Sequence, residues 1–168
     1  MLFLNEFITS HFRADRSFDK QRMASVRENM LQLVHKYLSV MNEQGPDGLR
    51  TVMAPDFRLK IAPKTLGLPP PGSLDAYIDL LKGSQKAMGS KNSKMFLVDG
   101  FEPVVDEAGH RVVLHLQSTA DSNFGPVENE FMVILKTTED GTKIKEQHEF
   151  MDSAAFAALM GKMQGQQA

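Results

Sequence analysis

Two residues of this chain are best suited to acid–base chemistry, Glu149 and His115. Each lies in a stretch whose apolar and polar residues alternate, as they do in a β-strand. An apolar cavity raises the pKa of a carboxyl group toward neutrality, and histidine titrates near neutral pH without such help. We therefore predict that Glu149 and His115 are catalytic residues that face one cavity and transfer protons as a pair. The alternatives are a surface carboxylate paired with Lys145, and a histidine that lies in the core or at an interface.

The strand that carries Glu149 is predicted to form a hairpin with the strand before it. Residues 127–136 and 144–151 are rich in β-type residues, and Asp140-Gly141 between them is a strong hairpin signal. Neither face of either strand is purely apolar, and a buried polar group is costly unless it is solvated or paired. The two strands are therefore expected to line a wet pocket or to lie at an interface.

Alternation along the hairpin limits which polar neighbours can share the cavity. Asn129 lies on the same face as Phe131, whereas Glu130 lies on the other, so only one of Asn129 and Glu130 can point inward. We favour Asn129. If Glu149 points inward, His148 points outward unless a bulge intervenes. Six residues are predicted to bind the substrate: Asn129, Arg58, Lys60, Leu68, Phe131 and Met151.

Two further segments are candidates for the mouth of the cavity. Arg58 and Lys60 alternate with apolar residues on a short strand, and they either anchor an anion or a carbonyl group there or remain solvated. Residues 66–72 include three consecutive prolines, which exclude regular structure. Because loops on a rigid scaffold often carry binding residues, we expect this segment, with Leu68 and Pro69, to border the entrance.

The remaining elements are helices toward both ends of the chain and strands between them. Steps of three and four between apolar residues predict a helix over 19–43, which Gly45-Pro46 ends. Asp47 is predicted to cap a short second helix that runs through Met53, and Ser73 is predicted to cap a third helix. Strands are expected at 57–61, 95–105 and 111–121 in addition to the hairpin, with a last helix from Ser153.

Helices followed by an antiparallel meander are typical of an α+β fold. The predicted strands exceed the usual five or six residues, which favours a strongly bent sheet. We expect this sheet, closed by the N-terminal helices, to form a cone with an internal cavity. Residues 1–18 form an apolar and then basic arm, which is either a disordered end or packs on a partner subunit. Residues 19–164 form one domain, and residues 165–168 form a frayed tail.

The composition argues against several classes of function. The 168 residues are 42% apolar and 24% charged, as in an ordinary soluble domain, and include no cysteine. Disulfides, zinc–thiolate sites and cysteine nucleophiles are therefore excluded. A net charge of −2 gives no reason to expect nucleic acid, and no apolar run is long enough for a membrane span. Metal-ligand spacings, nucleotide-binding motifs and hydrolase motifs are missing. We expect no metal, no cofactor and a cytoplasmic location.

Several motifs resemble those of fungal SnoaL-like proteins in the NTF2-like superfamily. They are Asn129-Glu130-Phe131, Asp140-Gly141, Lys143-Ile144 and residues 149–153, together with 54–57, 63–67 and 113–118. The resemblance covers roughly residues 20–160 and implies a dimeric α+β cone. Members include polyketide cyclases, dehydratases and meroterpenoid isomerases, usually without a metal or organic cofactor. Many of these proteins carry a histidine just after residues 54–56. This chain has Lys60 there, with Arg58 beside it, which disfavours a mechanism with two histidines.

Two functions are compatible with these observations. The first is a cofactor-independent enzyme of fungal secondary metabolism that isomerises, cyclises or dehydrates a polyketide- or meroterpenoid-like small molecule. The second is a non-catalytic NTF2-like module that binds a ligand or a protein. A catalytic cone should bury a carboxylate and a further proton donor or acceptor, whereas a binding module needs only apolar residues. We also expect a homodimer that forms through the sheet, because the sheet face outside the cone has apolar character that requires burial.

Overall fold

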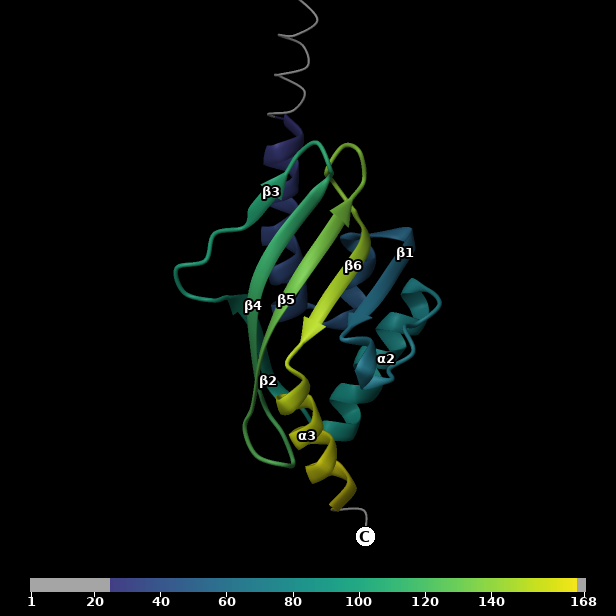
Figure 1. The fold of residues 1–168 in the computed structure, drawn as a ribbon, viewed down its shortest axis with the longest axis vertical. Helices are drawn as coiled ribbons and strands as arrows, with labels where there is room; N and C mark the ends of the chain where they lie inside the picture. Colours follow the sequence, from purple (N-terminus) through teal and green to yellow (C-terminus); the bar gives the residue numbers. More distant parts are fainter. Residues whose placement is uncertain (1–24, 166–168) are drawn as a thin grey trace, which may run out of the picture.

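A computed structural model describes residues 25–165 of the chain (Figure 1). Its centre is one bent sheet with the strand order β1-β6-β5-β4-β2, in which the short β3 also pairs with β4. The strands β1 and β6 run parallel, and the other pairs are antiparallel. The strands are β1 (Met53–Ala62), β2 (Lys91–Leu97), β3 (Val104–Asp106), β4 (Arg111–Asp121), β5 (Val127–Thr137) and β6 (Ile144–Met151).

The helices cover one side of this sheet and one of its ends. Residues 25–43 are helical, and they are followed by η1 (Pro46–Thr51), η2 (Lys64–Leu66), α2 (Leu74–Met88) and α3 (Ser153–Gly165). In Figure 1 the helix over 25–43 lies behind the sheet, and α2 and α3 lie toward its lower end. The predicted arm at 1–18, the predicted helix start at 19 and the end of the predicted tail lie outside the described residues. The predicted α+β class, with a bent sheet and N-terminal helices, is confirmed.

The core lies between the helices and the sheet face that carries Leu114, which we call the inner face. Alternation along β4 places Val112, Leu114 and Leu116 on this face, and all three are fully buried. The N-terminal helix packs a stripe of residues spaced by three and four against it. This stripe includes Met30, Leu33, Val34 and Tyr37. The opposite face of the sheet, which carries His115, is called the outer face.

The turn between β5 and β6 is fixed by its own residues and by the N-terminal helix. The Asp140 carboxylate accepts a hydrogen bond from Thr138 Oγ1 at 2.5 Å. The backbone oxygen of Asp140 accepts another from Asn29 Nδ2 at 2.8 Å. Gly141 has a φ of +74°, and a Cβ there would lie 2.9 Å from Met30 Cγ. The predicted Asp140-Gly141 turn is confirmed, and glycine is required there both by the backbone and by the adjacent helix.

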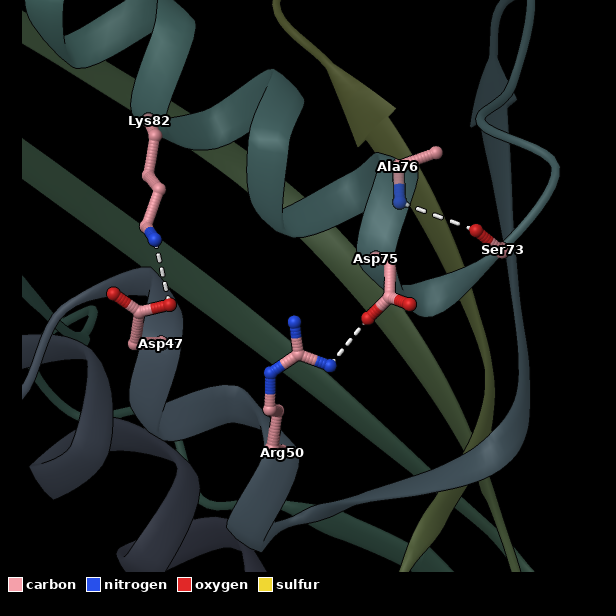
Figure 2. Close-up of polar contacts among 6 residues, drawn as sticks. All are labelled: Asp47, Arg50, Ser73, Asp75, Ala76 and Lys82. Carbon is pink, nitrogen blue, oxygen red and sulfur yellow. Dashed lines mark hydrogen bonds and ion pairs between the residues drawn. The ribbon is translucent and has the colours of Figure 1, made fainter.

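Two ion pairs join η1 to α2, and a serine caps the start of α2 (Figure 2). Lys82 Nζ lies 2.6 Å from the Asp47 carboxylate, and Arg50 pairs with Asp75. Ser73 Oγ accepts a hydrogen bond of 3.2 Å from the backbone N–H three residues later, which confirms its predicted role as an N-cap. Because both ion pairs are exposed, they orient α2 more than they stabilise it.

The predictions for Asp47 and Met53 are wrong. Asp47 lies inside η1, whose N-cap position is taken by Gly45, and its carboxylate contacts Lys82 instead of capping the helix. Met53 is the first residue of β1, where it pairs with Ile144 of β6. Pairing with β6 extends β1 toward its N-terminus, because contacts across the sheet override the local helical pattern.

The strand predicted over 95–105 is two separate strands. β2 begins earlier, at Lys91, and ends at Leu97, while β3 covers only Val104–Asp106. Between them Gly100 has a φ of +77°, and the Phe101 N–H donates to the Val98 carbonyl oxygen at 3.0 Å. Asp99-Gly100 therefore forms a turn and interrupts the apolar run.

Candidate active site

Four polar side chains meet where β6 faces the helices. Gln147 and Glu149 come from β6, Tyr37 from the N-terminal helix and Tyr77 from α2. Gln147 Nε2 lies 3.1 Å from Glu149 Oε2 and 3.4 Å from the Tyr77 hydroxyl oxygen. Tyr37, Tyr77 and Gln147 are buried, whereas Glu149 is half-buried. These four residues are called the polar cluster below, and they include both tyrosines of the chain.

A β-bulge determines which residues of β6 point inward. The pairing of β6 with β5 skips Lys145, so Ile144 and Gln147 both lie on the inner face although three positions separate them. The extra residue reverses the alternation that follows it. Glu149 is therefore on the inner face and His148 on the outer face, which is the predicted arrangement for these two neighbours.

Burial sets the proton affinities in the polar cluster. It raises the pKa of the Glu149 carboxyl, and the hydrogen bond from Gln147 opposes this rise. Burial also raises the pKa of Tyr37, with a smaller contribution from the charge of Glu149. The pKa of Tyr77 lies well above its ordinary value because of burial, then Tyr37, then Glu149. Both tyrosines therefore keep their protons at neutral pH, and Glu149 binds a proton more tightly than a solvated glutamate does.

An apolar pocket of about 590 Å³ opens between α2, α3 and the ends of β4, β5 and β6. Met151 lines it and lies on the same face of β6 as Glu149, two residues away, which is roughly 6–7 Å along a strand. None of the four residues of the polar cluster lines the pocket, which begins two residues further along β6, at Met151. The lining residues include no lysine or arginine. They are Leu80, Leu81, Gly83, Ser84, Ala87, Met88, Ser118, Val127, Glu128, Asn129, Met151, Ala155, Phe156, Leu159, Met160 and Met163.

Helix α3 serves mainly as a wall of this pocket. Its lining residues recur at helical spacing and form one stripe: Ala155, Phe156, Leu159, Met160 and Met163. From Ser153 to Met163 no residue of α3 is fully buried, so the helix contributes no side chain to the core. The apolar stripe of α3 therefore faces the space that a ligand would occupy.

His115 does not face the same cavity as Glu149, so the predicted pairing of these two residues is wrong. Its neighbours Leu114 and Leu116 are buried on the inner face, and alternation places His115 on the outer face. There His115 Nε2 lies 2.7 Å from Glu130 Oε1, and the ring packs edge-on against Phe101 with centroids 5.6 Å apart. The structure therefore gives no support to an acid–base role for His115 in this cavity.

The residues predicted to bind substrate fall into two groups. Asn129 and Met151 line the pocket, and Phe131 pairs with Met151 but is buried in the core. Arg58 and Lys60 lie on the outer face, since the intervening positions of β1 are buried, and Lys60 Nζ lies 2.8 Å from a Glu146 carboxylate oxygen. The structure therefore favours the solvated alternative for both basic residues.

The proline-rich segment 66–72 contributes no residue to the lining of the apolar pocket. Leu68 is half-buried and Pro69 is exposed. The predicted role of this segment at the pocket entrance is therefore not supported at this pocket.

Sequence reasoning did not identify Tyr37, Tyr77 and Gln147 as site residues. Both tyrosines occupy positions of apolar helical stripes, where they are read as ordinary core residues. A useful signal was available, because a buried tyrosine hydroxyl normally requires a hydrogen-bond partner. Gln147 lies two positions from Glu149, on the face predicted for that residue.

The described residues were also compared with what a metal site and a membrane span require. Among residues 25–165, no group of three histidine, cysteine, aspartate or glutamate side chains could hold a metal ion. None of the helices in this part of the chain is both long and apolar enough to cross a membrane.

Comparison with known proteins identifies relatives from fungal biosynthetic clusters. A scan against models of protein families finds no match. Austinoid biosynthesis clusters protein H of Penicillium brasilianum is 30% identical over 142 residues, which cover 84% of this chain and 95% of that protein. The chain belongs to this fungal SnoaL-like family.

Solved structures of family members have the same architecture. The pinacolase BvnE from Penicillium brevicompactum matches with a TM-score of 0.78 and 31% identity over 85% of this chain and 99% of its own. PrhC from Penicillium brasilianum, which is named an isomerase, matches with a TM-score of 0.77 and 25% identity over 85% and 93%. A SnoaL-like protein from Jannaschia sp. CCS1 shares the fold alone, with a TM-score of 0.61 at 13% identity. This chain, like these fungal relatives, is an isomerase-type enzyme of fungal secondary metabolism.

Proposed function

We propose that the chain isomerises, cyclises or dehydrates a neutral meroterpenoid- or polyketide-like molecule by general acid–base catalysis without a cofactor. The observation that carries this proposal is the position of Glu149. It lies on the inner face beside an apolar pocket, with two buried tyrosines and a glutamine around it. A module that only binds an apolar ligand has no need to place an ionisable carboxyl group among buried side chains there, because its partial desolvation is costly.

The lining of the pocket defines the class of substrate. Its volume is within the range of small-molecule sites, about 300–1,000 Å³. Four methionines supply adaptable apolar contacts: Met88, Met151, Met160 and Met163. With no basic side chain in the lining, the pocket offers no counter-charge to a phosphate or a carboxylate. Asn129, Ser84 and Ser118 can bind a few hydroxyl or carbonyl oxygens, which suits an oxygenated carbocyclic skeleton.

The polar cluster supplies the groups that such a reaction needs. As a carboxylate, Glu149 removes a proton from the substrate, and its raised proton affinity makes it a stronger base than a solvated glutamate. As the acid, it returns a proton to another carbon or to a departing hydroxyl group. Tyr37 and Tyr77 lie beside this carboxyl group and keep their protons at neutral pH, so they add no charge to the site. A neutral, apolar substrate that fills the pocket would displace water from it.

A product assay tests this proposal and separates the three reactions. The purified protein is incubated with a panel of neutral meroterpenoids and polyketides, and the products are analysed by chromatography with mass spectrometry. Isomerisation and cyclisation give a product of unchanged mass with a new retention time, whereas dehydration gives a mass lower by one water. Conversion of anionic, phosphorylated substrates in preference to neutral ones would contradict the proposed substrate class.

We also propose that the chain forms a homodimer through the outer face of the sheet. This face carries Phe96, Val113, Met132, Ile134 and Phe150, and the side chains of Phe96 and Phe150 are exposed. A large apolar patch on a sheet face is typical of an interface. Equilibrium sedimentation that shows only monomers at micromolar concentration would contradict the dimer. The cytoplasmic location stays a prediction.

A further inference from the structure

The amide of Gln147 has an unusual arrangement of partners. Gln147 is 1% exposed, so its polar atoms are cut off from solvent. Its Nε2 serves two acceptors, Glu149 Oε2 at 3.1 Å and the Tyr77 hydroxyl oxygen at 3.4 Å. Its Oε1 is buried and has no hydrogen-bond partner. A buried polar atom without a partner is rare and requires an explanation.

The charge of Glu149 provides that explanation. An amide can present either its nitrogen or its oxygen to a neighbour. Turned the other way, Gln147 would bring its oxygen against the carboxylate, and two acceptors would face each other. The observed orientation leaves Oε1 unpaired and directs an N–H at the carboxylate, and hydrogen bonds to charged groups are stronger than neutral ones. This orientation suits an ionised Glu149, whose carboxylate accepts from the amide N–H.

In the described part of the chain, no side chain other than Gln147 has a hydrogen bond or an ion pair with the Glu149 carboxylate. The titratable groups around Glu149 are Tyr37 from the N-terminal helix and Tyr77 from α2. The strands on either side of β6 place Val133 and Ile61 at the positions that pair with Glu149. Among residues 25–165, Glu149 forms no ion pair with lysine, arginine or histidine. Gln147 is thus the side chain that compensates the buried charge.

We propose that Gln147 is a positioning residue for Glu149, which holds the carboxylate in one orientation and keeps it in its ionised, proton-accepting form. The consequence of this positioning role for turnover rests on the proposed function, whereas the effect of Gln147 on the titration of Glu149 does not. Loss of the N–H removes a hydrogen bond that only the charged form needs, so the carboxyl group must then bind its proton more tightly.

The experiment titrates Glu149 in the intact protein without substrate. The ¹³C NMR signals of ¹³C-labelled glutamate carboxyl groups are followed against pH, and the Glu149 signal is assigned by its loss in Glu149→Gln. Gln147→Met keeps the side-chain length and removes the amide. Thr137→Val is the matched control, because Thr137 is a buried polar residue outside the polar cluster and lies on β5.

The expected result is a Glu149 midpoint at higher pH in Gln147→Met and an unchanged midpoint in Thr137→Val. If Gln147→Met does not fold, Gln147→Asn withdraws the N–H by one methylene and is expected to give the same upward shift. Tyr77→Phe removes the acceptor that shares Nε2 and should leave the midpoint unchanged or lower it. An unchanged or lower midpoint in a folded Gln147 variant would overturn the proposal, as would an upward shift in Tyr77→Phe alone. If the Glu149 midpoint shifts upward in Gln147→Met but the wild-type protein converts no substrate, the positioning role of Gln147 holds and the proposed function fails.

Discussion

At the scale of single residues, the function depends on how Glu149 is solvated. Burial raises its pKa, Gln147 opposes this rise, and the described structure gives it no cationic partner. A carboxylate held in this way is a stronger base than one on the surface, but it costs stability at pH values where it is ionised. Catalytic and structural roles for Glu149 therefore predict opposite effects when its charge is removed.

The pH dependence of stability tests this reading of Glu149. Because folding raises its pKa, its contribution to stability is fully present below the unfolded pKa, about 4.3, and is lost as pH rises through the folded pKa. Glu149→Gln removes this loss, so the variant should melt at the same temperature as the wild type or higher at pH 8. The difference should shrink toward pH 4. Calorimetry from pH 4 to pH 8 measures it, and a variant that melts well below the wild type at pH 8 would indicate a structural carboxylate.

At the scale of elements, β6 and α3 shape the site. The bulge at Lys145 turns Gln147 and Glu149 toward the helices, and α3 closes the pocket without joining the core. A ligand in the pocket should therefore contact α3, and substitutions on the lining residues of α3 should change ligand binding.

A charge on the apolar stripe of α3 should abolish binding of apolar ligands without unfolding the protein. Leu159 lines the pocket and is half-buried, so Leu159→Asp places an unpaired charge where an apolar ligand must lie. We expect the affinity for the neutral fluorescent probe Nile red to fall by about tenfold or more, which corresponds to at least ~1.4 kcal/mol. Ala158→Asp is the matched control, because Ala158 is exposed on the same helix. Equal binding by both variants would show that the probe does not occupy this pocket.

The sequence predicts elements better than it predicts which residues meet. Alternation and the Asp140-Gly141 turn indicate β4, β5 and β6 with nearly correct bounds, because these signals are local. Alternation predicts that Glu149 and His148 face opposite sides, but the bulge at Lys145 decides which of them points inward. The pairing with His115 failed because the register between strands is set by tertiary contacts, which place the two residues on opposite faces. Tyr37 and Tyr77 were missed because helical periodicity cannot distinguish a tyrosine that fills the core from one whose hydroxyl serves a site.

At the scale of the whole molecule, the sheet separates two environments. Its inner face carries the core, the polar cluster and the pocket. Its outer face carries exposed apolar residues together with the His115–Glu130 pair and the Lys60–Glu146 pair. An interface on the outer face leaves the pocket between α2 and α3 open.

Disruption of the outer face should therefore dissociate the proposed dimer while preserving the site. Phe150 is 51% exposed on this face, and Phe150→Glu should shift the protein from dimer to monomer in analytical ultracentrifugation. Lys86→Glu, at an exposed position on α2, is the control for an added negative charge. A dimer that persists in Phe150→Glu would place the interface elsewhere.

The catalytic role of Glu149 is the central claim, and turnover by Glu149→Gln on a substrate identified in the product assay tests it most directly. The substitution keeps the size and hydrogen bonding of the side chain but removes the titratable carboxyl group. A general acid–base group typically contributes about 10²–10⁴-fold to the rate, so turnover should fall by that order while melting temperature and oligomeric state are kept. Glu130→Gln, on the outer face, should retain wild-type turnover. Near wild-type turnover by folded Glu149→Gln would contradict the account.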